Sequence, residues 1–132
     1  MSRAATSTPE TVSRRPDAQE TLRIVLARLD DMKAEDTVTI DQTGKSPICD
    51  YLVVTSGRSQ RHVASVAENV IKDLHAAGLR NVRVEGLKQG DWVLIDAGDV
   101  IVHVFKPDVR AFYNLEKMWS AGKADGKRSP AN

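Results

Sequence analysis

Apolar residues recur every three or four positions in two long stretches of the chain, which is the spacing of one helix face. The first stretch predicts a helix over residues 17–33, with Pro16 near its first turn. The second predicts a helix that begins after Ser59 as the N-cap and ends at Gly78. The two apolar faces comprise Leu22, Val25, Leu26, Leu29 and Met32, and then Val63, Val66, Ala67, Val70, Leu74 and Ala77.

Shorter apolar runs predict strands at 37–41, at 50–55, around Val82 and Val84, and twice within 91–105. The run at 50–55 is nearly continuous, as expected of a strand buried on both faces. A short helix or turn is predicted over 107–114, followed by an amphipathic turn over 115–119. This order contains a strand–helix–strand crossover, which is right-handed as a rule. The sequence therefore predicts an α/β domain with a mixed β-sheet of about five strands packed with helices.

Both ends of the 132-residue chain are polar, so one domain is expected between them. Residues 1–16 are predicted to be a disordered N-terminal extension, 17–119 the domain, and 120–132 a flexible tail. No stretch approaches the roughly 20 apolar residues that span a bilayer, and no secretory signal precedes the domain. A bacterial cytoplasmic location is therefore expected. The Arg-containing extension weakly resembles a mitochondrial leader, which gives the alternative location.

The charge balance and the single cysteine limit the kinds of partner and of cysteine chemistry to be expected. With 19 basic and 18 acidic residues the net charge is +1, which argues against a dedicated DNA or RNA binder. It leaves open a protein partner within a nucleic-acid particle. Cys49 is the only cysteine, so no internal disulfide forms, and we expect it to be a small structural hydrophobe rather than a nucleophile.

Residues 91–105, DWVLIDAGDVIVHVF, read as a hairpin that comes last in the strand order and is therefore expected at a sheet edge. A two-residue loop at Ala97 and Gly98 places Trp92 opposite His103; a three-residue loop mixes the faces and is disfavoured. One face is then aliphatic and belongs to the core. The other face is mixed and carries Trp92, Leu94, Asp96, Asp99, Ile101, His103 and Phe105.

Three interpretations of the mixed face remain open. A helix covers it, which makes Trp92 a core residue and leaves His103 at the rim. Alternatively it is exposed, because Trp and Leu beside His and Asp have the composition of an interface hot spot. The third interpretation, a magnesium site at Asp96 and Asp99, is disfavoured because Asp is common in hairpin turns and the Asp-x-Asp spacing is missing.

Other candidate chemistry is weaker. The turn at 55–59, TSGRS, lies between a strand and a helix, where backbone amides with Arg58 and Arg61 bind phosphate in some proteins. It has one Gly and no Walker Lys, so a turn followed by an N-cap is the favoured interpretation. His62, His75 and His103 lack metal-ligand spacing. No catalytic, cofactor-binding or metal-binding residue is therefore expected.

Several separated motifs are similar to those of one known family. They are DYLVVTSG at 50–57, S-x-RHV at 59–63, VEG at 84–86, DW at 91–92, GDVIVH at 98–103 and YNLEKMW at 113–119. In this order they resemble the ribosomal silencing factor family, also called Iojap-like. The resemblance runs from about residue 22 to 119.

The resemblance implies a nucleotidyltransferase-like fold without the catalytic carboxylates, and no enzyme activity. It implies binding to a large-subunit ribosomal protein on the intersubunit face, which blocks the small subunit and represses translation under nutrient limitation or in stationary phase. Tyr113, Glu116 and Trp119 match the family pattern but alternatively lock the C-terminal segment onto the sheet. The partner-binding candidates are Trp92, Leu94, Asp96, Asp99, Ile101, His103, Tyr113, Glu116 and Trp119.

Two rival hypotheses accompany the silencing factor. One is a nucleotide-binding or nucleotidyltransferase-type enzyme, which predicts magnesium-dependent nucleotide binding near Arg58, Ser59 and Asp99. The other is a self-associating scaffold, in which the hairpin face forms a homodimer of the free protein. No cofactor, DNA partner or membrane partner is expected under the first hypothesis.

Overall fold

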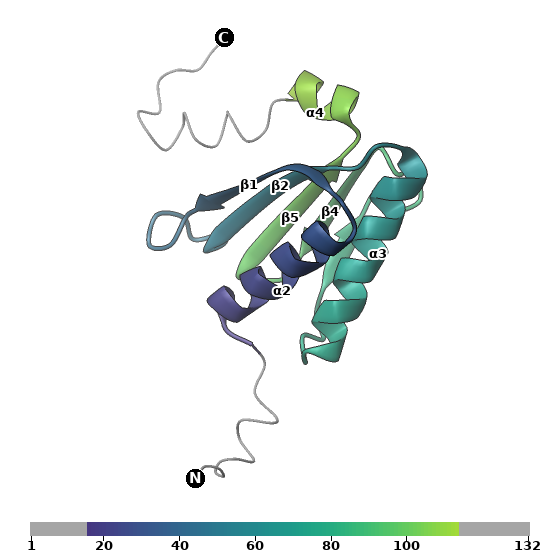
Figure 1. The fold of residues 1–132 in the computed structure, drawn as a ribbon. Helices are drawn as coiled ribbons and strands as arrows, with labels where there is room; N and C mark the ends of the chain where they lie inside the picture. The colour runs from purple at the N-terminus through teal and green to yellow at the C-terminus, as the bar shows by residue number, and fades with distance from the viewer. Residues whose placement is uncertain (1–15, 114–132) are drawn as a thin grey trace.

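The computed structural model describes residues 16–113 as a five-stranded sheet with two long helices on one face and a short helix at its end (Figure 1). The strand order is β1-β2-β5-β4-β3, in which β2 and β5 are parallel and the other pairs antiparallel. The elements are α2 (Ala18–Asp31), β1 (Glu35–Asp41), β2 (Tyr51–Ser56), α3 (Gln60–Ala76), β3 (Arg83–Glu85), β4 (Trp92–Asp96), β5 (Val100–Phe105) and α4 (Pro107–Tyr113).

Both long helices are capped close to their predicted ends. The Asp17 carboxylate accepts the Glu20 amide at 2.9 Å, and Glu20 accepts the Asp17 amide in return, which makes a capping box for α2. The Ser59 hydroxyl accepts the His62 amide at 3.1 Å at the start of α3. Gly78 follows α3 with φ of +106°. The predicted helices and the mixed α/β sheet are confirmed.

The position of the hairpin in the sheet differs from the prediction. β5 lies between β2 and β4, so the hairpin is interior and the edges of the sheet are β1 and β3. The crossover through α3 lets β5 pair in parallel with β2, and this buries the most apolar strand on both sides. The last strands in the sequence are therefore not the outer strands in space.

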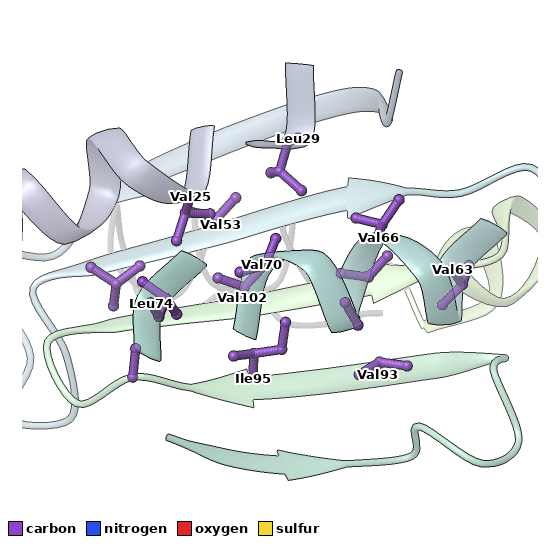
Figure 2. Packing of buried hydrophobic residues seen from close by; sticks show 14 of the residues in the cluster. Val25, Leu29, Val53, Val63, Val66, Val70, Leu74, Val93, Ile95 and Val102 are labelled. Atoms are coloured by element: carbon purple, nitrogen blue, oxygen red, sulfur yellow. The ribbon is translucent and has the colours of Figure 1, made fainter. Parts of the chain in front are cut away.

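The face of the sheet that α2 and α3 cover, here called the near face, holds the main core. Figure 2 shows aliphatic side chains of both helices meeting those of the strands. Arg28 of α2 donates to both carboxylate oxygens of Asp73 on α3, at 2.7 and 3.1 Å, and so joins the two helices. The buried residues of this core include Val25, Leu29, Val53, Val63, Val66, Val70, Leu74, Val93, Ile95, Val100, Val102 and Val104.

The opposite face of the sheet, here called the far face, carries a smaller cluster. Ile40, Cys49, Leu52, Val54 and Phe105 are buried in it, and Val109 of α4 packs against them. Burial is the main cause that raises the pKa of the Cys49 thiol. The prediction that Cys49 is a buried hydrophobe is confirmed.

The ends of the predicted domain plan lie outside the described residues. This applies to the N-terminal extension apart from Pro16, to the C-terminal tail, and to the amphipathic turn at 115–119. Among residues 16–113, no helix is long and apolar enough to cross a bilayer.

Candidate functional site

The β4–β5 hairpin turns at Gly98 and Asp99, which corrects the predicted loop at Ala97 and Gly98. The Ala97 amide donates to the Val100 carbonyl at 2.9 Å, and Gly98 adopts φ of +88°. Glycine at the first loop position is typical of tight hairpins. Ala97 is instead buried in the near-face core, which explains why it does not lie in the loop.

The shift moves every cross-strand pair by two residues but leaves both faces intact, because side chains alternate with a period of two. Trp92 pairs with Phe105, and Leu94 pairs with His103. The aliphatic face is therefore the near face, as predicted, and the mixed face is the far face. Asp99 leaves the strand pair and lies in the loop.

Trp92 is held by two aromatic neighbours on β5. Its ring stacks on Phe105 with centroids 4.9 Å apart and an interplanar angle of 26°. Its indole Nε1 donates to Nδ1 of His103 at 3.0 Å. Phe105 is fully buried, while Trp92 is only partly buried. The indole is thus fixed in orientation before any partner arrives, which lowers the entropy cost of a contact through it.

His103 supports Trp92 rather than facing solvent. Its side chain is 8 % exposed, and burial lowers the pKa of its imidazole from 6.5 to about 4. Because Nδ1 accepts the indole proton, the ring is neutral with its own proton on Nε2. The suggestion that His103 lies at the rim is wrong, whereas its place among the partner-binding candidates stays a prediction.

Four far-face residues are partly exposed and adjacent; we call them the Trp92 patch. Trp92 and Leu94 form its apolar centre with Ile101, and Asp96 pairs with Ile101 across the strands. Among residues 16–113, both long helices pack on the near face, so neither covers this patch (Figure 1). The exposed-interface interpretation of the hairpin fits this geometry better than the helix-covered one.

The rim of the Trp92 patch includes two residues that the sequence argument missed. Arg83 pairs with Asp96, and Glu85 pairs with Leu94, so both belong to the far face of β3. Both are exposed. The alternation in Arg-Val-Glu at 83–85 indicates that Arg83 and Glu85 share one face of a strand. Only the pairing of β3 with β4 shows that this face is the far face.

Asp91 fixes the start of β4. Its carboxylate accepts the side-chain amide of Gln60 at 2.8 Å and lies 3.8 Å from the ammonium of Lys106. Its carbonyl accepts the Lys106 amide at 2.9 Å. Gly86 lies against the Trp92 carbonyl, where a Cβ atom would collide. The backbone that carries Trp92 is therefore tied to α3, β5 and the preceding turn.

One carboxylate of the hairpin stabilises the turn. Asp96 accepts the Gly98 amide at 2.9 Å, the local bond expected of Asp in a hairpin. Within residues 16–113 there is no group of three or more His, Cys, Asp or Glu side chains with metal-site geometry. The hairpin geometry thus gives no support to the magnesium-site interpretation.

Two amides of the turn at 55–59 are bonded within the protein. The Gly57 amide donates to the Phe105 carbonyl at 2.8 Å, and the Arg58 amide donates to Nδ1 of His62 at 2.9 Å. The other ring nitrogen of His62 bonds the Met32 carbonyl at 2.8 Å. Amides that are already bonded do not cradle a phosphate, so the turn-and-cap interpretation fits this segment.

Three candidate residues lie at or beyond the end of the described part. Tyr113 is the last residue of α4. Glu116 and Trp119 lie outside the described residues. Their assignment to the partner surface or to the C-terminal segment stays a prediction.

Comparison with known proteins decides the family. The model of the family described as "Ribosomal silencing factor during starvation" matches residues 15–131. The chain belongs to the ribosomal silencing factor family. A ribosomal silencing factor from Zymomonas mobilis is 47% identical over 106 residues, which cover 80% of each chain. The family is regulatory rather than catalytic, and the resemblance seen in the sequence is confirmed.

Solved structures and distant relatives agree with this assignment. A crystal structure of a protein from Chromobacterium violaceum has a TM-score of 0.76 and 34% identity, and covers 87% of this chain and 92% of its own. A mouse relative named "Mitochondrial assembly of ribosomal large subunit protein 1" is 30% identical over 95 residues, which are 70% of this chain and 42% of that protein. A nucleotidyltransferase-like ancestry of this silencing-factor fold stays a prediction.

Proposed function

We propose that this silencing factor binds a large-subunit ribosomal protein on the intersubunit face and blocks joining of the small subunit. Translation is thereby repressed under nutrient limitation or in stationary phase. The observation that carries the proposal is the Trp92 patch, an apolar centre with a charged rim on the far face. The names of the relatives, silencing factors and a large-subunit assembly protein, supply the kind of partner.

The mechanism requires occupancy and no chemistry. Subunit joining uses a large surface, and a 14.5 kDa protein bound within it excludes the small subunit. Affinity comes from the preorganised indole of Trp92 and from Leu94 beside it, since aromatic anchors dominate interface energies. Asp96 and Asp99 favour a basic partner, which suits a protein that itself lies against RNA. On this proposal the protein is not an enzyme.

Cosedimentation with separated ribosomal subunits tests the proposal. The wild type is expected to bind the large subunit and not the small one. Leu94→Ala should weaken binding about tenfold, because it removes part of the apolar centre and leaves the Trp92 stack intact. The matched control is Leu26→Ala, a truncation of the same size at a partly buried position of α2 on the other side of the sheet.

Trp92→Ala is the stronger variant. It should lower affinity by roughly 2 kcal/mol or more. Because it also removes the bond to His103, its fold is checked by circular dichroism. Subunit joining in the presence of each protein is followed on sucrose gradients, where inhibition should track large-subunit binding. Failure of the wild type to bind either subunit would refute the function, whereas equal binding by Leu94→Ala and Leu26→Ala would refute only the site.

The location and the free state belong to the same proposal. We place the protein in a bacterial cytoplasm, where it meets ribosomes directly. A homodimer of the free protein through the far face is the state that competes with ribosome binding. Light scattering of the purified protein tests it, and a monomer at all concentrations would exclude it.

A further inference from the structure

Positive charge is concentrated along one edge of the sheet, next to the Trp92 patch. Arg80, Arg83 and Lys88 are exposed and lie on β3 or in the segments that flank it; we call them the basic strip. Among residues 16–113, none of the three takes part in an ion pair or a side-chain hydrogen bond. Glu85 is the one acid within 80–90, so this segment carries a net charge of +2 from three bases and one acid.

The opposite edge of the sheet has the opposite sign. Exposed carboxylates on β1 are those of Glu35, Asp36 and Asp41, and Arg58 lies 3.7 Å from the first of them. β1 and β3 are the two ends of the strand order, so the charges are separated by the full width of the sheet. The overall charge of +1 hides this polarity. A polar charge distribution of this kind orients a protein on a charged surface.

The basic strip is continuous with the proposed interface. Arg83 of β3 lies opposite Asp96 of the Trp92 patch in the strand register. The edge of a partner protein that covers the patch therefore lies at β3. The acids and the apolar centre suit a basic protein, while the cations beyond them do not. The cations suit a second surface, one of negative charge.

We propose that the basic strip contacts ribosomal RNA phosphates at the border of the protein-binding site. This inference rests on the proposed function and adds a second partner to it. A guanidinium group donates two parallel hydrogen bonds to phosphate oxygens, and the Lys88 ammonium adds a point charge. Asn81, which is exposed beside them, is a neutral hydrogen-bonding neighbour. The protein thus grips the particle at two chemically different places, which fixes its orientation over the joining surface.

The salt dependence of large-subunit binding tests this inference. Contacts with phosphate release counterions, so the logarithm of the binding constant falls with the logarithm of the salt concentration by about 0.7 to 0.9 per phosphate. The triple variant Arg80→Gln, Arg83→Gln and Lys88→Gln should lower the size of that slope by about 2 between roughly 50 and 200 mM salt. Its matched control is Arg23→Gln, Arg61→Gln and Lys72→Gln, three exposed cations of α2 and α3 with the same change of net charge.

An equal slope for the triple variant and the wild type would overturn the inference, and so would an equal fall in both triple variants. A second measurement identifies the partner. A photoreactive residue that replaces Asn81, with the cations intact, should crosslink to ribosomal RNA; a crosslink to protein alone would also overturn the inference. If the wild type does not bind the large subunit at all, the proposed function fails first. If Leu94→Ala weakens binding and the slope is unchanged, only the RNA contact fails.

Discussion

The buried imidazole of His103 makes the stability of the fold depend on pH. In the folded protein, burial lowers its pKa to about 4, whereas an unfolded histidine has a pKa near 6.5. The unfolded state therefore binds more protons between these values, and stability rises with pH. The contribution of His103 is complete above about pH 6.5 and is lost as the pH falls toward 4.

The size of the effect follows from the two pKa values. The full difference corresponds to about 3 kcal/mol, and the part lost between pH 7 and pH 5 is about 2 kcal/mol. The immediate surroundings support this, because the cross-strand partners of His103 are the apolar Val54 and Leu94. The charged far-face residues on β4 and β3 are Asp96, Arg83 and Glu85, all more exposed.

Urea unfolding at pH 7 and pH 5 measures this contribution. His103→Gln is the comparison, since a glutamine offers an oxygen to the Trp92 indole and does not titrate. The wild type should lose about 2 kcal/mol more than His103→Gln on going from pH 7 to pH 5. All other ionisable side chains are identical in the two proteins, so their effects cancel in the difference. Equal losses in the two proteins would refute the reasoning.

Three further experiments have defined outcomes. Gly86→Ala places a Cβ atom against the Trp92 carbonyl at φ of +84° and should lower the free energy of unfolding by more than about 2 kcal/mol. Gly44→Ala, at φ of +73° with open space around it, should lower it by about 1 kcal/mol. Thermal unfolding compares the two variants, and equal losses would contradict the collision at Gly86. Ser59→Ala removes the cap of α3 and should cost about 1 kcal/mol in urea unfolding, with no cost counting against the cap. Cys49 should react with a disulfide reagent only as fast as the fold opens, so rapid labelling of native protein would show that it is not buried.

The sequence was sufficient to predict the helices and strands whose apolar residues follow one regular spacing. The helical spacing in α3 and its caps at Ser59 and Gly78 were legible because they depend on neighbours within a few residues. The two faces of the hairpin were also legible, since alternation survives a register error of two residues. The prediction of the loop residues was wrong. Ala97 beside Gly98 has the local composition of a turn, and its burial in the core is a tertiary contact that the local sequence does not show.

Strand order was beyond the reach of the local pattern. Residues 91–105 alone do not indicate that β5 pairs with β4 on one side and with β2 on the other. That pairing is a non-local choice, made because it buries the most apolar strand in the middle of the sheet. The same choice brings Arg83 and Glu85 to the rim of the Trp92 patch, which explains why sequence reasoning missed both.

The strand order also accounts for why an aromatic residue stays partly exposed here. With β5 central, Phe105 and His103 are buried beneath the far face, and Trp92 on β4 lies one strand nearer the edge. Its ring rests on both buried neighbours and stays partly exposed, because both long helices pack on the near face. The arrangement thus combines a rigid support with an accessible surface, which is what a preorganised interface requires.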